Sequence, residues 1–439
     1  MLKWLRRGLF SVLVLLVLLL LAVQFLRWTA YGEEERAAVA LAGVPPPPAT
    51  GRSGFAALAL SDFEVPKDAM DAEMAAEVRN YSRWLADQGD SVIDGEIETW
   101  VPSVAARYPV RAPLTYSSSL CTLGGANCLA LVKADTGAMR ELVAGQSERL
   151  ALVDQALAAD HLRNPYPPSH HAPFPPYSAL RLSLTQAAFD AVDGRVPEAL
   201  ARTCRTLAGA RRFNADAHDL VGKMVFPALA EGSVALLLDL RREYPGVPLP
   251  AGCAPALVPV QPSEVLICDA MRGEFRQGAA LTAMQEKAPA DRWSPAALFS
   301  RWVLMDGRLQ DAWMAHTLAA PCTDDYRHAV LAGSVPVSPE KPVSRDDVRC
   351  YAALISCVLA EIALPAYGDY QGRLLDHAAR LRLVLAAHSA VGTDVRPAEL
   401  HSAAASPGYA IAVDPEARTL SVRSRFARAA GTSDFKVAF

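Results

Sequence analysis

The chain has 439 residues, of which 51% are hydrophobic and 21% charged, and its formal net charge is −4. This length and composition allow a large buried core and exclude an intrinsically disordered polyelectrolyte. The near balance of 43 basic and 47 acidic residues gives no electrostatic footprint for nucleic acid, so we expect no nucleic-acid partner.

An apolar run near the amino terminus predicts one transmembrane helix. Residues 8–26 are interrupted only by Ser11 and Gln24. At about 1.5 Å per residue the run spans roughly 28 Å, close to the thickness of a bilayer's hydrocarbon core. We assign the span to 8–28, which contains the following leucines: Leu9, Leu16, Leu21 and Leu26. A cleaved signal peptide is the alternative, but the run is longer than a typical signal sequence.

The charges that flank this run predict its orientation. Lys3, Arg6 and Arg7 precede it, whereas three glutamates follow at 33–35. By the positive-inside rule, residues 1–7 form a cytoplasmic tail and the rest is exported. We therefore expect a single-pass protein of a bacterial inner membrane with most of its chain in the periplasm, and the lipid bilayer as its first partner.

A spacer is expected between the membrane and the body. Residues 29–66 are rich in alanine and proline and include four consecutive prolines at 45–48. Such a segment favours extended polyproline conformations and acts as a semi-rigid tether. Recognition of the prolines by a partner domain is the alternative.

Eight cysteines in an exported chain predict disulfides. Cys121 and Cys128 flank a turn-rich stretch and are the favoured pair, and Cys253 with Cys268 is the second choice. The last two, at 350 and 357, read as part of one helix, which would separate them by about 10.5 Å along its axis. That exceeds the reach of a disulfide, so we expect them to pair elsewhere, with Cys322 a candidate partner. No C-x-x-C spacing is present, and we predict neither a metal site nor a cofactor.

The body, residues 67–395, is predicted to be helical. Apolar residues recur at helical spacing in ten segments: 69–86, 129–159, 178–192, 197–212, 215–244, 263–280, 295–305, 309–318, 345–364 and 372–388. Residues 396–439 should hold a small β-hairpin, with strands at 409–413 and 419–425, and a tail. The predicted fold is mainly α: a transmembrane helix, then a large irregular stack of helical hairpins with a small C-terminal β-hairpin.

Catalytic patterns are sparse, and we predict no catalytic residue. His170 and His171 lie in a proline-rich loop, where adjacent side chains point apart. The Asp–His neighbours at 160–161, 218–219 and 376–377 fall on expected helices, where their side chains diverge. Glu274 lies between Arg272 and Arg276 and is interpreted as part of an exposed ion-pair cluster.

The layout of anchor, tether and helical exported body resembles that of the lipase-specific foldases, steric chaperones of secreted lipases. The stretch from Tyr81 to Asp90 is similar to their aromatic motif, but Val78 and Ser82 depart from it. We interpret the stretch as an amphipathic helix with Tyr81, Trp84 and Leu85 in the core. Our functional prediction is a membrane-anchored periplasmic interaction or scaffold protein that binds another envelope protein. The alternatives are a steric chaperone or inhibitor-like binder, and an enzyme without a recognisable motif.

Overall fold

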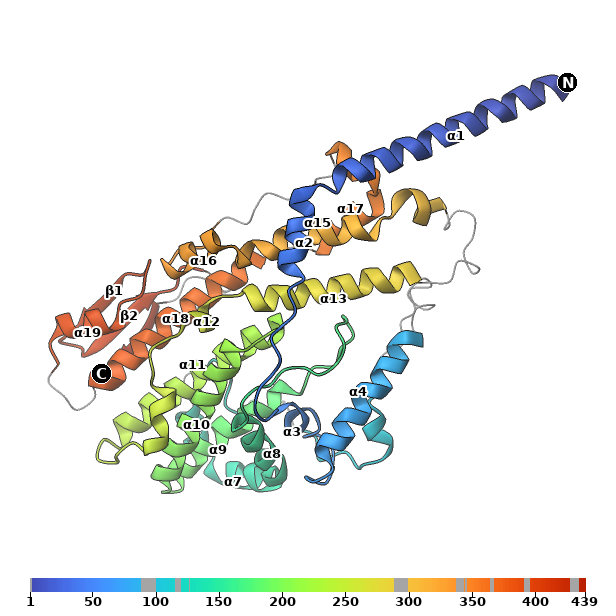
Figure 1. Cartoon of the computed structure of the whole chain (residues 1–439). Helices are drawn as coiled ribbons and strands as arrows, with labels where there is room; N and C mark the ends of the chain where they lie inside the picture. The colour runs from blue at the N-terminus through green and yellow to red at the C-terminus, as the bar shows by residue number, and fades with distance from the viewer. Residues whose placement is uncertain are drawn as a thin grey trace.

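A computed structural model describes residues 2–87, 100–114, 120–125, 127–287, 299–336, 343, 346–363, 367–390, 395–426 and 434–439. Helices dominate these residues, and a small antiparallel sheet lies near the carboxyl terminus (Figure 1). This confirms the predicted mainly α fold. The described residues show two large apolar cores, which we call the main core and the α1-side core.

The first helix, α1 (Leu2–Ala30), projects from the body as a long rod (Figure 1). Its apolar side chains are exposed over most of its length, including Leu9, Leu16 and Leu21. Leu26, near its end, packs against the α1-side core instead. The segment Arg6–Ala30 is long and apolar enough to cross a membrane. Helix α11 (Leu220–Glu243) is also long and apolar enough, but it is mostly buried in the body.

The main core is built around α9, α10 and α11, which pack on one another. Small residues at their contacts, such as Ala187 and Ala210, allow the helices to approach closely. Pro197 stands in the first turn of α10, where its missing N–H costs nothing. The helical elements of this region are α6 (Cys128–Ala134), α7 (Thr136–Gly145), α8 (Ser147–Leu157), η2 (Tyr177–Leu180), α9 (Arg181–Val192), α10 (Val196–Ala215), α11 (Leu220–Glu243), η3 (Ala251–Ala256) and α12 (Pro262–Val265).

The single helix expected over 129–159 is instead divided into α6, α7 and α8. Asp135 leaves helical geometry after α6, and its carboxylate accepts a hydrogen bond from the Ala138 N–H to cap α7. The helix is interrupted again at Gln146, which lies between α7 and α8. An aspartate that caps a new helix can be read as a helix residue when only the apolar periodicity is considered.

The α1-side core gathers the end of α1 with helices distant in sequence. Trp313, which is 1% exposed, lies in this core. Its elements are α2 (Glu33–Ala42), α13 (Cys268–Lys287), the π-helical turn η5 (Ser300–Leu304), α15 (Gly307–Ala319), η6 (Ala320–Cys322), η7 (Val348–Ala352) and α17 (Leu354–Ala363). Figure 1 shows α2, α15 and α17 gathered at the base of α1.

Further helices flank the two cores. Tyr81 is fully buried, as the amphipathic interpretation predicted, but Trp84 and Leu85 are only half-buried and do not lie in the core. Residues 88–90 of the foldase-like stretch lie outside the described residues. Helix α18 packs on α11 and contributes Leu374 to the α1-side core and Leu383 to the main core. The flanking elements are α3 (Phe55–Ala59), α4 (Met70–Asp87), η1 (Ser103–Ala106), α16 (Asp324–Leu331), α18 (Tyr367–Ala390) and α19 (Pro397–Ala404).

The C-terminal sheet contains the predicted hairpin and one more strand. β1 (Ile411–Asp414) pairs antiparallel with β2 (Thr419–Arg423), and β3 (Asp434–Ala438) pairs antiparallel with the other edge of β2. Leu420 and Val422, on one face of β2, are buried in the main core. A lone hairpin is only marginally stable in water, and the third strand adds the pairing that a small sheet needs.

The eight cysteines form four disulfides. Cys121 joins Cys128, as the sequence predicts. The second pairing expected from the sequence is wrong, because Cys253 joins Cys204 and Cys268 joins Cys322. The expectation that Cys350 and Cys357 pair elsewhere is also wrong. They are bonded to each other across a break between η7 and α17, which places their Cα atoms 5.5 Å apart.

The segment expected to be an extended tether is folded onto the body. It contains α2, whose Ala42 is fully buried, and α3, whose Leu58 is fully buried. Between these helices, the backbone of Arg52 exchanges hydrogen bonds with Asp160. The body therefore sits directly at the end of α1, and 29–66 does not act as a free spacer.

Candidate functional site: an aromatic pocket between the two cores

A pocket of about 330 Å³ lies where the main core meets the α1-side core. Most of its wall is aromatic or apolar, and its polar groups come from the loop after α8, the α10–α11 turn and α13. The lining residues are Pro46, Leu162, Arg163, Asn164, Tyr166, Pro168, Ala172, Phe174, Phe213, Asp216, Ala217, His218, Asp219, Phe226, Gly273, Arg276 and Gln277. A pocket of this size and composition is typical of a binding site.

A proline-rich loop after α8 forms the aromatic side of the pocket. The Asn164 side chain closes this loop, because its Nδ2 donates to the Pro173 carbonyl and its Oδ1 accepts from the Tyr166 N–H. Tyr166 packs edge-to-face on Phe55 and Tyr81, which fixes its ring. Phe174 remains 43% exposed at the rim. The loop thus presents two aromatic rings from a fixed backbone.

An ion pair holds the loop to the end of α10. The Arg163 guanidinium donates to both oxygens of Asp216, with Nε at 2.9 Å from Oδ2, and it also donates to the carbonyl of Pro47. Burial alone would raise the pKa of Asp216, but the hydrogen bonds from Arg163 and His218 outweigh it and lower the pKa to about 2. Asp216 is therefore charged at any physiological pH and serves as a fixed brace.

Two more acids cap the start of α11. Asp219 accepts a hydrogen bond from the Gly222 N–H at 2.6 Å, and Glu274 of α13 accepts from the Leu220 N–H at 3.2 Å. Burial raises the pKa of both carboxyls. Gly273 permits this approach, since a Cβ there would lie 1.9 Å from the His218 carbonyl oxygen. The interpretation of Glu274 as part of an exposed ion-pair cluster is wrong, because its carboxylate faces α11 and not its arginine neighbours.

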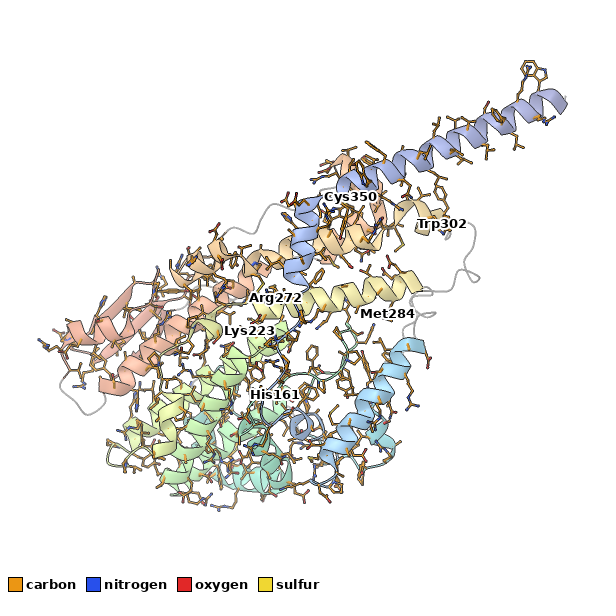
Figure 2. All side chains as sticks on the ribbon, in the orientation of Figure 1. His161, Lys223, Arg272, Met284, Trp302 and Cys350 are labelled. Carbon is orange, nitrogen blue, oxygen red and sulfur yellow. A yellow bond between two sulfur atoms is a disulfide. The ribbon has the colours of Figure 1, made fainter. Side chains whose placement is uncertain are left out.

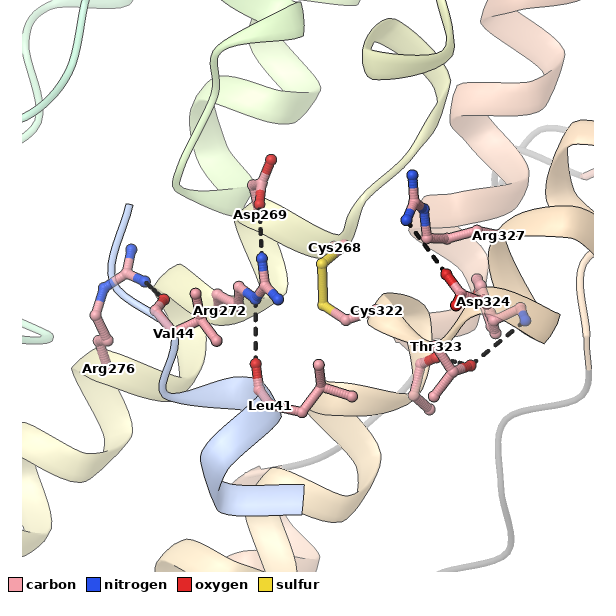
Figure 3. Close-up of a disulfide and its surroundings, with 12 residues drawn as sticks. Leu41, Val44, Cys268, Asp269, Arg272, Arg276, Cys322, Thr323, Asp324 and Arg327 are labelled. Carbon is pink, nitrogen blue, oxygen red and sulfur yellow. Dashed lines mark hydrogen bonds and ion pairs between the residues drawn. A yellow bond between two sulfur atoms is a disulfide. The ribbon is translucent and has the colours of Figure 1, made fainter. Parts of the chain in front are cut away.

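Those neighbours bind the end of α2 and the chain that follows it. Arg272 Nε donates to the Leu41 carbonyl at 3.1 Å, and Arg276 donates to the Val44 carbonyl. Figure 3 shows both contacts beside the disulfide between Cys268 and Cys322, which joins α13 to η6, the short turn after α15. We call residues 41–47 the strap, because their carbonyls are held by arginines of both cores and Pro46 forms part of the pocket wall.

The histidines singled out from the sequence do not form a reactive centre. His170 is exposed, while His171 stacks edge-on against Trp84. At 160–161, the Asp160 carboxylate accepts from the Arg52 N–H. At 376–377, Asp376 accepts from Tyr409 and His377 contacts Glu231. Only the pair at 376–377 lies in a helix, α18. The helices expected at 160–161 and 218–219 are wrong, because both pairs lie in turns between helices, and at 218–219 His218 contacts Asp216 while Asp219 caps α11. Among the described residues, no group of three potential metal ligands is close enough to hold an ion.

Sequence reasoning missed the pocket residues Arg163, Asp216 and Phe174. One signal was present: aromatic residues alternate with prolines at 164–177, a composition that gives a rigid loop able to present rings. The partner elements of the pocket are distant in sequence, however, and carry no such signal.

Comparison with known proteins adds no relative: no protein-family model, no curated protein and no solved structure matches this chain. The interpretation of the site therefore rests on its geometry.

The stability of this region should depend on pH through Lys223, one turn into α11. Lys223, which is labelled in Figure 2, is 2% exposed. Its ammonium donates to the carbonyls of Asn214 and Ser263. Burial lowers its pKa from 10.5 to about 7. Between these values the unfolded chain binds a proton that the folded chain does not, so stability rises with pH.

We expect Lys223→Met to abolish this contribution. From pH 7 to pH 9, the free energy of unfolding of the wild type should rise by about 2 kcal/mol relative to the variant. Urea titrations at several pH values measure this difference. Lys133→Met is the control, since Lys133 is 43% exposed in its ion pair with Glu243. Parallel pH profiles for wild type and Lys223→Met would contradict the expectation.

Proposed function

We propose that the chain is a membrane-anchored periplasmic binding protein, which engages another envelope protein through the pocket between its two cores. One observation carries the proposal. The pocket offers aromatic and apolar walls, while Arg163, Asp216 and Asp219, charged groups in its lining, are engaged in internal contacts. Such a site is suited to recognition by burial of apolar surface rather than to proton transfer.

The expected ligand is an apolar or aromatic side chain presented by a partner polypeptide. Phe213 and Phe226 lie at 5.4 Å between ring centroids in the pocket wall, and Phe174 stands at the rim. Aromatic anchors that insert into well-packed pockets supply much of the energy of protein interfaces. Arg276 and Gln277 at the edge of α13 can bond the backbone of such a partner.

Localisation is part of the same proposal. The apolar helix α1 and the four disulfides support a single-pass inner-membrane protein whose body occupies the oxidising periplasm. The strap and α2 hold the two cores together close to α1, so the pocket is presented at a fixed position relative to the anchor.

Photocrosslinking from the pocket rim tests the proposal. A benzophenone amino acid at Gln277 of the full-length protein, irradiated in intact cells, should give a discrete adduct with an envelope protein. Phe174→Ala in the same chain should reduce the adduct about tenfold, which corresponds to about 1.4 kcal/mol of binding. Val258→Ala is the matched control, because Val258 is 42% exposed and lies outside the pocket.

The outcome distinguishes recognition in the pocket from random contact. An adduct that Phe174→Ala leaves unchanged, or that Val258→Ala reduces equally, would contradict the proposal. So would the absence of any adduct at Gln277 when a known membrane complex is captured in parallel.

A further inference from the structure

Large apolar side chains are exposed on the body around the base of α1. They come from three elements and are each at least 50% exposed: Phe299, Trp302, Val348, Tyr351 and Ile362. The elements that carry them, η5 with Phe299 just before it, η7 and α17, contact one another, so these side chains are exposed on adjoining elements. We call this surface the α1-side patch. Exposed apolar side chains gathered in one place mark an interaction surface rather than an ordinary solvated face.

Helix α17 is apolar on its outward side as well as on its inner side, where Cys357 and Ala360 lie in the α1-side core. Its outer face carries Ile355, Val358, Leu359 and Ile362, which follow helical spacing and are half-buried or exposed. Its inner face carries the buried Ser356, whose hydroxyl accepts a hydrogen bond from the Asp306 N–H at 3.0 Å. A helix that is apolar on both sides is suited to an apolar surrounding on its outward side as well.

The contacts of α1 show at which point along this helix the patch lies. Arg27 of α1 donates to the carbonyls of Met305, which follows η5, and Ala352, in η7, at 2.6 and 2.9 Å. Val23 lies one turn before Arg27, closer to the middle of the apolar run, and it is buried, with only 7% of its surface exposed. Hence η5 and η7 flank α1 at the outer end of its apolar run. Figure 2 places Trp302 and Cys350 on the side of the body from which α1 projects.

We propose that the α1-side patch inserts into the outer interfacial layer of the bilayer that α1 spans. This rests on the membrane anchoring in the proposed function and extends it: the body sits on the lipid surface by a second contact. Trp302 and Tyr351 are the residue types that favour the headgroup level, and Trp28 of α1, 76% exposed, lies at the same end of the helix. Ile362 and the outer face of α17 reach the acyl boundary.

Continuity with α1 favours lipid over a protein partner. The exposed apolar surface of α1 runs from Leu9 to Phe25 and Trp28, and it reaches the elements that carry the patch. A lipid surface that receives α1 therefore meets the patch without any change in the body. The second contact would fix the tilt of the body and with it the direction in which the pocket faces.

Spin-label accessibility tests this directly. Because all eight native cysteines are paired, one added cysteine gives one labelling site. The full-length protein is placed one copy per nanodisc, in phosphatidylethanolamine and phosphatidylglycerol, and the label's collisions with oxygen and with a water-soluble nickel chelate are compared. The test sites are Trp302→Cys and Ile362→Cys, 71% and 63% exposed. Val101→Cys and Val110→Cys, 70% and 64% exposed on the far part of the body, are matched controls.

Leu16→Cys, in the middle of α1, reports the anchor separately. We expect labels at 302 and 362 to favour oxygen over the chelate several-fold relative to 101 and 110, in the same direction as the label at 16. Aqueous values at 302 and 362 with an immersed label at 16 would overturn the second contact and leave the anchor intact. Aqueous values at all three would overturn both. Labels at 302 and 362 that collide with neither oxygen nor the chelate would also overturn the lipid contact, in favour of a protein that covers the patch.

Discussion

Replacement of Arg27 by alanine is expected to lower the free energy of unfolding of the full-length protein by about 3–5 kcal/mol. Arg27 is 9% exposed, and it donates to three carbonyls of the body while its Nε lies 3.6 Å from Asp306 Oδ2. Without the guanidinium, those carbonyls lose a donor and Asp306 is left as a poorly compensated buried charge. Urea titration in mild detergent, followed by near-ultraviolet circular dichroism, measures the change.

Arg308→Ala is the matched control for Arg27. Arg308 also approaches Asp306, at 3.7 Å, but its side chain is 72% exposed. An ion pair at the surface contributes little, so this variant should lose less than about 1 kcal/mol. Equal losses in the two variants would contradict the assignment of Arg27 as the residue that joins α1 to the body.

Glu264→Gln is expected to destabilise the body by a similar amount, about 3–5 kcal/mol. Arg211 and Glu264 are 4% and 3% exposed and form a two-pronged pair, with Nε–Oε2 at 2.9 Å and Nη2–Oε1 at 2.7 Å. Arg211 also donates to the carbonyl of Ala256, so its guanidinium cannot turn toward water without breaking α10 from η3. Glutamine keeps the shape and removes the compensating charge, which leaves a buried cation.

The control for Glu264 is the exposed pair between Arg396 and Glu399, which are 81% and 50% exposed. Glu399→Gln should change the free energy of unfolding by no more than about 0.5 kcal/mol. Thermal and urea unfolding of both variants measure the two effects. A loss below about 1 kcal/mol for Glu264→Gln would show that the buried pair is dispensable.

Much of the fold follows from local sequence signals. The periodicity at 197–212 and 372–388 predicts α10 and α18, and Pro245 stands just after the end of α11 at Glu243. Local signals fail where a turn between two helices has the same apolar periodicity as one continuous helix. Residues 345–364 have the periodicity of one helix, but Ala353 adopts φ −156° and ψ 71° and turns the chain between η7 and α17. That turn brings Cys350 to Cys357.

The pocket could not be predicted because long-range contacts create it. Arg272 and the carbonyl it binds, Leu41, are 231 residues apart, and nothing near 41–47 shows that the strap will be held. Its prolines indicate an extended segment, and the structure uses that extension to cross from one core to the other. The Cys204–Cys253 and Cys268–Cys322 pairings could not be predicted for the same reason, because disulfide connectivity depends on which helices pack together.

The most direct test of the account is the side of the membrane on which the body lies. Glu416→Cys, on the exposed turn between β1 and β2, and Arg6→Cys, before the apolar run, each add one free thiol to the full-length protein. A membrane-impermeant maleimide is added to intact spheroplasts of an expressing bacterium. We predict that position 416 reacts at once, that position 6 reacts only after permeabilisation, and that the protein stays with the membrane after an alkaline wash. Protection of position 416 in intact spheroplasts, or release of the protein by the wash, would contradict a membrane-anchored body outside the cytoplasm.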